Sequence, residues 1–545
     1  MTIVHLLERN AKLWPDEMAL IEVNPDQKEN RRVTWREFEL VQSGWRMESF
    51  RREFSWRIFD EKTNRIANLL SQRYGIGKGS RVAILLMNCI DWLPIYFGIL
   101  KTGAIAVPMN FRYSSEEIKY CLKLAECSML IFGTSFLGRV EEILDRIPEV
   151  MLLYYGFSFP MFADPMMDMI NDSSGIYPEC SLDEDDDAAI YFSSGTTGFP
   201  KAILHKHRSL IHAARTEQAH HGQTRDDCFL CIPPLYHTGA KMHWFGSLMA
   251  GSRAVLLTGT HPDTILKAIS DEKCTIVWLL VPWAQDILAA LDRGELDIKD
   301  YELDQWRLMH IGAQPVPQSL VHRWLQYFPK HDYDTNYGLS ESTGPGALHL
   351  GIGNIHKVGA IGKPGFGWEA KIIDENGGIT PQGAVGELCI KGPGIMVCYY
   401  NNPEATEAVL KDGWLRTGDM AKEDEDGFIY LVDRKKDVII SGGENLYPVE
   451  IENYISSCPL VKDVAVIGLP DPRLGEIATA IVQKLPGVEC TEEDIMKYCE
   501  GMARYKRPRK IIFAEVPRNP TGKIEKPKLR KMYGAEAVVD MQNKA

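Results

Sequence analysis

The sequence predicts an α/β protein: a large N-terminal body with two sheets of parallel type and a small β-barrel, then a small α+β domain. Three observations support this. Short apolar runs alternate with helical patterns in two regions before residue 320, and glycine-punctuated strand-like pieces follow from about residue 355. The alternation then resumes on a smaller scale beyond about residue 434. Repeated strand–helix–strand order is typical of parallel sheets, because each parallel crossover needs a connecting helix.

The first alternating region predicts strands at 81–88, 104–110 and 127–133, with helices at 91–103 and 116–126 between them. The second region predicts strands at 228–234, 253–259, 275–282 and 308–313. The most apolar stretch, 82–109, is interrupted by Asn88, Asp91 and Lys101. A membrane-spanning helix needs about 20 predominantly apolar residues, so we expect a buried strand, helix and strand and no transmembrane segment.

The later elements follow the same reasoning. Segments 370–378, 386–400 and 427–440 predict the small barrel or meander. Segments 449–471, 478–483 and 510–533 predict the α+β domain. We place the boundary near Asp433–Lys436, which gives a large N-terminal body at 1–433 and a C-terminal domain at 434–545.

A local echo lies near the N-terminus, where TWREFE (34–39) recurs as SWRIFD (55–60). Two copies are too few for a repeat architecture. We interpret residues 40–54 as part of a helical insertion or duplication, whose role the sequence does not reveal.

Composition excludes several classes. With 61 basic and 74 acidic residues the net charge is −13, which argues against a general nucleic-acid binder or a protein of anionic membrane surfaces. The twelve cysteines show no spacing framework, which predicts reduced thiols and a cytoplasmic protein. Cys228 and Cys231 form one C-x-x-C inside a predicted strand, and we expect apolar packing there. The oligomeric state is not fixed by the sequence, and a homodimer stays open.

The stretch AAIYFSSGTTGFPKAILHKH (188–207) places small and hydroxyl residues directly after a predicted buried strand. Such a loop exposes backbone N–H groups and hydroxyls that suit a polyphosphate, although a purely structural turn would look the same. It is not a Walker A loop, because Pro200 precedes Lys201 and Ala202 follows it.

Four further segments change the balance between these readings. They are NYGLSES (336–342), GWLRTGDM (413–420), DRKKDVIISGGENLYPVEIE (433–452) and PTGKIEK (520–526). Each alone has a structural explanation as a hairpin turn, a capped helix or a solvated charge. Chance does not explain why all four segments occur together in this order and with this spacing.

Together with the loop, these segments resemble the adenylate-forming superfamily, which includes acyl-CoA synthetases, luciferases and peptide-synthetase adenylation domains. The resemblance runs from about Val33 to about Lys531. It implies a mobile C-terminal domain and a reaction in two steps. A carboxylate attacks the α-phosphate of ATP to give an acyl-adenylate and pyrophosphate, and the thiol of coenzyme A then displaces AMP. ATP, Mg²⁺ and coenzyme A are the implied cofactors.

The resemblance also implies roles for single residues. The phosphate loop would use Ser193, Ser194, Gly195, Thr196, Thr197, Gly198 and Lys201, and Mg²⁺ would be held by Glu341 and Thr196. Adenine would lie between Tyr337 and the wall formed by Gly312, Ala313, Gln314 and Pro315, in a segment that includes Asn336 and Gly338. Ser340 would face the α-phosphate, and the ribose would be bound by Asp419 and Arg434. Lys523 would bridge the carboxylate and α-phosphate, Lys436 would be the hinge, and Gly442 and Gly443 would line the pantetheine tunnel.

The segment 233–251 matches the superfamily's acyl site, with His237 as a further catalytic candidate. An amino-acid substrate is disfavoured, because His237 and Thr238 stand where an aspartate would pair an α-amino group. Ala240 leaves room for an acyl group. Lys241 and His243 could face a second carboxylate, but we favour the outer face of the helix.

We therefore expect an acyl-CoA synthetase for a hydrophobic carboxylic acid, fatty or cyclic. The alternatives are an aryl or alicyclic acid CoA ligase, an adenylating enzyme that delivers the acyl group to a carrier protein or to oxygen, and a non-catalytic nucleotide-binding scaffold. The identity of the acid and the physiological direction of the reaction cannot be read from the sequence.

Overall fold

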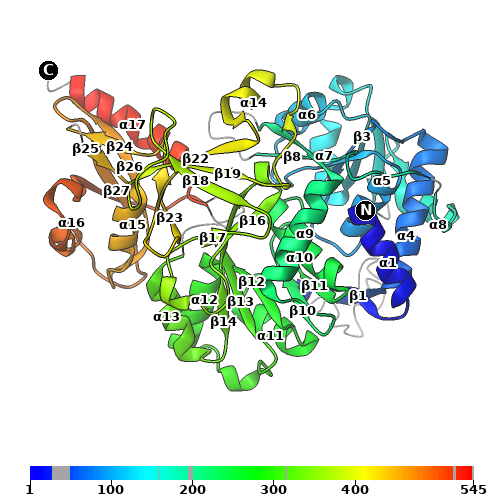
Figure 1. The fold of residues 1–545 in the computed structure, drawn as a ribbon, viewed down its shortest axis with the longest axis horizontal. Coiled ribbons are helices and arrows are strands. Elements are labelled where there is room, and N and C mark those ends of the chain that lie inside the picture. Colours follow the sequence, from blue (N-terminus) through cyan, green and yellow to red (C-terminus); the bar gives the residue numbers. More distant parts are fainter. Residues whose placement is uncertain are drawn as a thin grey trace, which may run out of the picture.

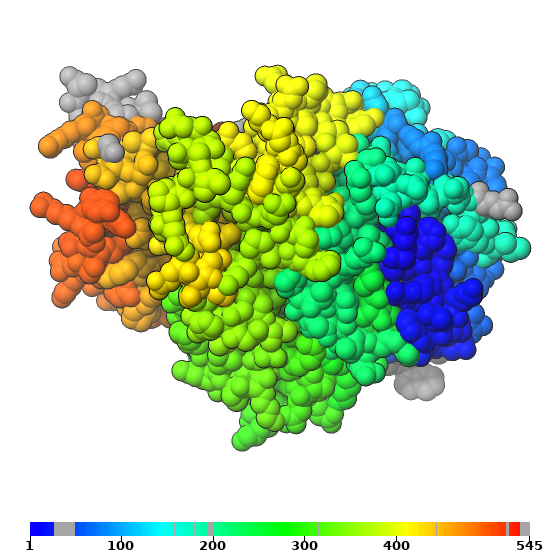
Figure 2. All heavy atoms as spheres, in the orientation of Figure 1, coloured from blue at the N-terminus to red at the C-terminus, as the bar shows by residue number. Residues whose placement is uncertain are grey.

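The structure is a computed structural model that describes residues 1–26, 50–156, 159–178, 180–193, 200–312, 316–442, 444–518 and 523–542. Two large sheets and the helices around them form the body. The residues beyond about 434 form a lobe at one end of the molecule (Figures 1 and 2). This is the predicted arrangement of a larger N-terminal body and a smaller C-terminal unit.

The first sheet has eight strands in the order β20-β9-β8-β4-β3-β5-β6-β7. From β8 to β7 neighbouring strands are parallel, while β9 and β20 are added antiparallel. The strands are β3 (Arg81–Leu85), β4 (Ile105–Pro108), β5 (Met129–Gly133), β6 (Met151–Tyr155), β7 (Asp164–Pro165), β8 (Asp187–Phe192), β9 (Ala202–Lys206) and β20 (Cys398–Tyr399).

The second sheet has seven strands in the order β14-β13-β12-β10-β11-β1-β2, parallel throughout except for β2 at one edge. They are β1 (Met18–Val23), β2 (Arg51–Ser55), β10 (Cys228–Cys231), β11 (Arg253–Leu257), β12 (Ile276–Leu280), β13 (Leu308–Gly312) and β14 (Asp332–Asp334). Both parallel sheets are therefore confirmed. Cys228 and Cys231 are buried within β10, as expected for apolar packing.

The largest apolar core lies between the two sheets and is filled by helices. These are α1 (Ile3–Leu13), α4 (Trp56–Asn68), α5 (Trp92–Lys101), α9 (His207–His221) and α10 (Thr238–Ala250). Every residue of α5 is buried, and its Lys101 Nζ lies 2.5 Å from the Asp60 carboxylate. The apolar stretch is thus core, as predicted. Among the helices that the structure describes, none has the length and apolar character needed to cross a bilayer.

Helices also cover the outer faces of both sheets. On the first sheet these are α6 (Ser115–Leu124) and α7 (Leu137–Glu141), with α8 (Met166–Asp172) beside β6; on the second they are α11 (Pro262–Glu272), α12 (Val281–Asp292) and α13 (Gln318–Tyr327). Ser114 caps α6 in a reciprocal capping box with Glu117, which satisfies amide donors at the start of that helix.

The glycine-rich region takes the form of two antiparallel sheets. The smaller has the order β15-β16-β17, and the larger is an open sheet of order β18-β19-β22-β21 with β23 paired to β22. Their strands are β15 (Asn336–Leu339), β16 (Gly344–His349), β17 (Lys363–Pro364), β18 (Glu369–Ile373), β19 (Gly386–Lys391), β21 (Leu410–Lys411), β22 (Trp414–Glu423) and β23 (Ile429–Arg434), with α14 (Pro403–Val409) beside them.

The C-terminal lobe has one five-stranded sheet of order β25-β24-β27-β26, with β28 parallel to β27. Its elements are β24 (Ile439–Ser441), β25 (Glu444–Leu446), α15 (Pro448–Ser456), β26 (Val461–Asp471), β27 (Gly475–Lys484), α16 (Glu492–Tyr498), β28 (Lys510–Phe513) and α17 (Lys526–Gln542). Two separate apolar clusters on its two faces give the lobe a core of its own.

The expectation of a helical insertion at 40–54 is wrong where the structure describes it. Residues 51–54 belong to β2, which pairs antiparallel with β1. This edge strand begins with Arg51, Arg52 and Glu53, which are exposed or half-buried. Its sequence therefore lacks the alternation of apolar and polar residues that indicates a strand. Residues 27–49 lie outside the described residues.

Candidate active site

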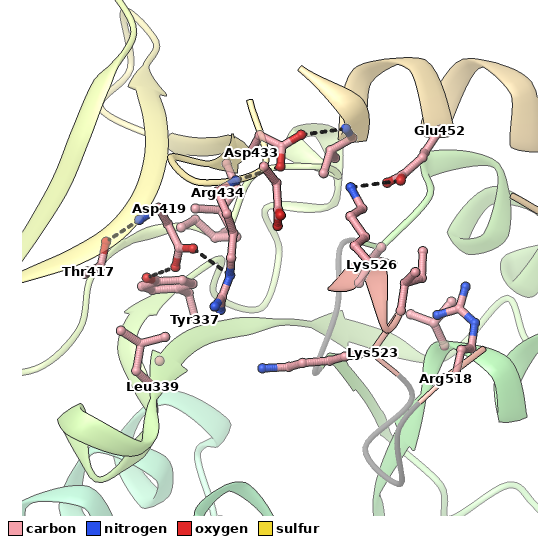
Figure 3. A pocket seen from close by; sticks show the side chains of 18 of the residues that line it. Tyr337, Leu339, Thr417, Asp419, Asp433, Arg434, Glu452, Arg518, Lys523 and Lys526 are labelled. Carbon is pink, nitrogen blue, oxygen red and sulfur yellow. Dashed lines mark hydrogen bonds and ion pairs between the residues drawn. The ribbon is translucent and has the colours of Figure 1, made fainter. Parts of the chain in front are cut away.

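A cavity of about 1910 Å³ opens between the body and the C-terminal lobe. It brings together side chains from β15, β22 and β23 of the body and from the segment before α17 (Figure 3). Twelve of the residues expected at the site line it: Ser193, Lys201, His237, Asn336, Tyr337, Gly338, Ser340, Glu341, Asp419, Arg434, Lys436 and Lys523.

A hydrogen-bonded trio stands on one wall of the cavity. Asp419 of β22 lies directly opposite Arg434 of β23 in the strand register, and its Oδ1 is 3.1 Å from Arg434 Nε. Its other oxygen, Oδ2, accepts from the Tyr337 hydroxyl at 2.6 Å. The Asp419 carboxylate raises the pKa of Arg434, and burial together with that carboxylate raises the pKa of Tyr337. The trio is therefore a fixed array of one aromatic ring, one anion and one cation.

The ends of the loop 193–201 are held together at the base of the β8–β9 hairpin. The Ser193 amide donates to the Lys201 carbonyl at 3.0 Å, and the Lys201 amide donates to Ser193 Oγ at 3.2 Å. Lys201 Nζ lies 4.5 Å from the centre of the Tyr399 ring, and the Tyr399 hydroxyl donates to Glu341 Oε1 at 2.8 Å. A cation and a carboxylate thus meet at one tyrosine beside the cavity.

Lys523 enters the cavity from the C-terminal lobe and points toward the trio and Leu339 (Figure 3). Burial lowers the pKa of Lys523 to about 8, and the positive charge of Arg434 adds to this, while Asp419 and Glu341 oppose it. A lysine with a strongly shifted pKa in a cavity is a candidate functional residue.

His237 caps the N-terminus of α10, where its Nδ1 accepts from the Gly239 amide at 3.2 Å. The accepting Nδ1 leaves the proton on Nε2, so the ring can donate from that atom. Burial lowers the pKa of His237 to about 3, with a contribution from the Lys523 charge. The imidazole is therefore neutral at physiological pH.

Trp278 of β12 and Gly239 of α10 both line the cavity. A Cβ on Gly239 would lie 2.8 Å from Trp278 Cη2, so the indole ring is in close contact with the start of α10. The favoured outer-face placement of Lys241 and His243 is wrong, because both are fully buried. Lys241 Nζ lies 4.1 Å from the centre of the Tyr191 ring, where cation–π attraction replaces solvent.

Some expected residues are not among those that line the cavity. Gly312 ends β13, and Gly442 has φ +61° in the turn between β24 and β25. Gly338 does line the cavity, but a Cβ there would lie 1.8 Å from the Gly344 carbonyl oxygen, so strand packing also requires glycine. Outside the described residues lie Ser194, Gly195, Thr196, Thr197, Gly198, Ala313, Gln314, Pro315 and Gly443.

Charged contacts surround the residues that join the body to the lobe. Lys526 Nζ of α17 lies 2.9 Å from Glu452 Oε1 of α15, and Asp433 Oδ2 accepts from the Val449 amide at 2.8 Å. Burial raises the pKa of Asp433 to about 6. Burial also lowers the pKa of Lys436, which lies in the connecting turn.

Tyr399 and Trp278 were not predicted from the sequence. Each is an aromatic residue within or beside a strand-like run, where core packing is the ordinary interpretation. Tyr399 is the last residue of β20, and the pairing of β20 with β9 brings its side chain to the 193–201 loop.

Family models and known relatives match most of the chain. The profile described as "AMP-binding enzyme" matches residues 44–400, and that of the "AMP-binding enzyme C-terminal domain" matches residues 450–523. The chain is 35% identical over 478 residues to the long-chain-fatty-acid–CoA ligase FadD13 of Mycobacterium tuberculosis, covering 87% of this chain and 92% of that ligase. It is 32% identical over 486 residues to a feruloyl-CoA synthase of Amycolatopsis sp, with 87% and 94% covered.

Among solved structures, the anthranilate CoA ligase AuaEII in complex with anthranoyl-AMP superposes with a TM-score of 0.87. The sequence identity is 27%, and the match covers 99% of this chain and 98% of that one.

Proposed function

Because this chain belongs to the AMP-binding enzyme family and is an adenylate-forming CoA ligase, we propose that it activates a compact, largely apolar carboxylic acid. The observation that carries the choice of a compact acid is Trp278, which lines the cavity and packs against Gly239. An indole ring in the cavity wall offers a flat face on which an aryl or alicyclic acid can pack.

The first step joins two anions, the substrate carboxylate and ATP. A carboxylate oxygen bonds to the α-phosphorus as the bond to pyrophosphate breaks, and negative charge moves onto the phosphate oxygens. We assign Lys523 to the point between the two reactants, since preorganised positive charge is most effective where charge develops. Asp419 and Arg434 hold the ribose, and Tyr337 lies against adenine.

Mg²⁺ fits the residues present, because Glu341 offers a hard oxygen ligand beside the cavity and the Tyr399 hydroxyl orients it. When bound there, the ion would supply positive charge to the phosphates of ATP. The hydroxyls of the 193–201 loop would approach the same phosphates.

In the second step the thiol of coenzyme A loses its proton to solvent and its sulfur attacks the acyl carbon. The carbon–sulfur bond forms as the carbon–oxygen bond to AMP breaks, and AMP leaves with the bonding electrons. We propose that residues 434–545 act as a mobile domain that turns at Lys436 and withdraws Lys523. The neutral His237 then donates a hydrogen bond from Nε2 to the acyl group. Because the ring is uncharged, it places no positive charge there. The free thiols of all twelve cysteines agree with a reducing, cytoplasmic setting.

The substrate class is tested by ATP–pyrophosphate exchange with a panel of ring and straight-chain acids, followed by thioester formation with coenzyme A. Ring acids should give the highest kcat/KM. A preference for chains of twelve or more carbons would contradict the compact acid but leave the ligase activity standing.

Replacing Trp278 should change this preference. In Trp278→Leu the cavity is enlarged at this wall, so kcat/KM for a straight-chain acid should rise at least about tenfold relative to a ring acid. Trp283→Leu is the matched control, because this tryptophan lies in the first turn of α12 and is not among the residues that line the cavity. The two variants should differ in substrate preference, and equal shifts would remove Trp278 from the acyl site.

The pH dependence should report the Lys523 ammonium. Its pKa of about 8 in the free enzyme means that the charge is present below pH 8 and is lost above it. The kcat/KM of pyrophosphate exchange should therefore fall about tenfold per pH unit above that value. ATP phosphates favour the charged form, so the fall in kcat should begin at higher pH. In Lys523→Arg, whose guanidinium stays charged, any residual activity should lack this alkaline limb.

A further inference from the structure

Six titratable side chains are buried together behind Trp278 and Asn336, two residues that line the cavity. We call them the His/carboxylate cluster: Glu217 and His221 of α9, His243 of α10, His310 of β13, Asp334 of β14 and His349 of β16. Each is between 0 and 3% exposed. Burial of so many polar groups costs folding free energy unless protons or a cation compensate the carboxylates.

Asp334 is the centre of one half of the cluster. Its Oδ2 lies 3.3 Å from His349 Nδ1, 3.4 Å from His221 Nε2 and 3.8 Å from His310 Nδ1. Nitrogen and oxygen ligands at about 2.1 Å from a tetrahedral ion lie about 3.4 Å from one another. The His349 contact is a hydrogen bond, and His221 Nε2 also lies 3.0 Å from His310 Nδ1. The separations from Asp334 Oδ2 equally suit atoms that share one ion.

Glu217 lies on the other side of the same imidazoles. Its Oε2 is 3.6 Å from His243 Nε2 and 3.7 Å from His221 Nδ1, while Oε1 is 3.7 Å from His349 Nε2. Among the described residues, Glu217 Oε2, His310 Nε2 and His349 Nε2 have no hydrogen-bond partner although they are buried. Buried polar atoms without a partner are unusual in a folded protein, so these three atoms show that the hydrogen-bond capacity of the cluster is not satisfied by its own side chains.

The ring of His243 shows how the cluster is oriented. His243 Nδ1 lies 2.8 Å from the Gly239 carbonyl oxygen, so this nitrogen carries the proton and Nε2 of the neutral ring presents a lone pair. That lone pair accepts from Asn336 Nδ2 at 3.4 Å and lies 3.6 Å from Glu217 Oε2. A ring nitrogen that donates to a backbone carbonyl is also the usual way in which a protein fixes a metal-facing imidazole.

We propose that the cluster binds one transition-metal ion of the zinc class through His221, Asp334 and His349, with His310 beside them. His221 belongs to both groups of three whose ligand atoms lie within 4.8 Å of one another: His221 with His243 and His310, and His221 with Asp334 and His349. Imidazole-rich sites favour Zn²⁺ and its neighbours over Mg²⁺ or Ca²⁺, which prefer oxygen ligands.

The site is closed and its role is structural. The ion joins α9 to β14 and β16, and it fixes the floor of the acyl pocket through two contacts. His243 stacks on Trp278 with ring centres 4.3 Å apart, and Asn336 Nδ2 donates to Glu217 Oε1 at 3.2 Å. The expected consequence of metal loss is lower stability and a looser acyl pocket.

The test starts from the full-length protein purified without chelator or affinity metal. Elemental analysis should give about one zinc-class ion per chain. Treatment with a strong chelator should lower Tm by about 5 °C or more, and Zn²⁺ but not Mg²⁺ should restore it. Protein reconstituted with Co²⁺ should show visible d–d absorption typical of a low-coordinate nitrogen and oxygen site.

His221→Gln should lose both the stoichiometric metal and the cobalt absorption. His331→Gln is the matched control: His331 is also a largely buried histidine of the second-sheet region, packed on Trp306 at 4.3 Å, and it should keep both. If His221→Gln does not fold, the chelator and cobalt measurements on the unaltered chain decide. A metal-free protein whose Tm responds to neither chelator nor Zn²⁺ would overturn the proposal and indicate protonated imidazoles bridging the two carboxylates.

Discussion

Lys523→Ala should reduce acyl-adenylate formation by about 100- to 1000-fold, because it removes the cation that offsets charge developing between carboxylate and α-phosphate. The effect should appear in kcat of ATP–pyrophosphate exchange. Thioester formation from supplied acyl-adenylate should stay largely intact, since the proposed mechanism withdraws Lys523 before that step.

Lys531→Ala provides the comparison for this variant. It removes the same ammonium from an exposed position on α17 that does not line the cavity, and both half-reactions should be unchanged. Equal loss of the two half-reactions in Lys523→Ala would count against the assigned role.

Asp419→Asn should raise KM for ATP strongly and lower kcat/KM by about 10- to 100-fold, the range for hydrogen bonds that involve charged groups. The substitution keeps an acceptor for the Tyr337 hydroxyl but removes the charge that faces Arg434. Because AMP occupies the same ribose site in both half-reactions, the thioester step should weaken as well.

Asp426→Asn is the control for the loss of a carboxylate. Asp426 pairs with Lys357 in the turn between β22 and β23, away from the cavity. Direct titration with AMP measures the binding contribution, and unchanged AMP affinity in Asp419→Asn would exclude this residue from the ribose site.

Much of the fold could be predicted because the apolar runs in the sequence coincide with the strands and helices that are buried in the structure. The runs at 81–88 and 275–282 became central parallel strands, and the apolar helix after Asp91 became core between two sheets. Asp419 and Arg434 could be paired only by resemblance, yet their strands bring them into direct register.

The His/carboxylate cluster could not be predicted for a physical reason. Its members come from five elements and are as far apart as Glu217 and His349, so no short motif connects them. The error on Lys241 has a related cause. A lysine at helical spacing ordinarily marks an outer face, but α10 is buried on all sides and aromatic rings from other elements surround its amine.

The position of Arg434 connects the cavity to the turn that leads into the C-terminal lobe. Arg434 is the last residue of β23, and its carbonyl accepts from the amides of Asp437 and Val438, so the guanidinium and the connecting turn share one backbone anchor. A ligand bound to the Arg434 side chain would therefore also favour particular orientations of the C-terminal lobe, which follows Arg434 in the chain. With the roles proposed for Arg434 and Lys436, the binding of AMP and the orientation of the lobe would be linked by reciprocity, so release of AMP would depend on the turning of the lobe.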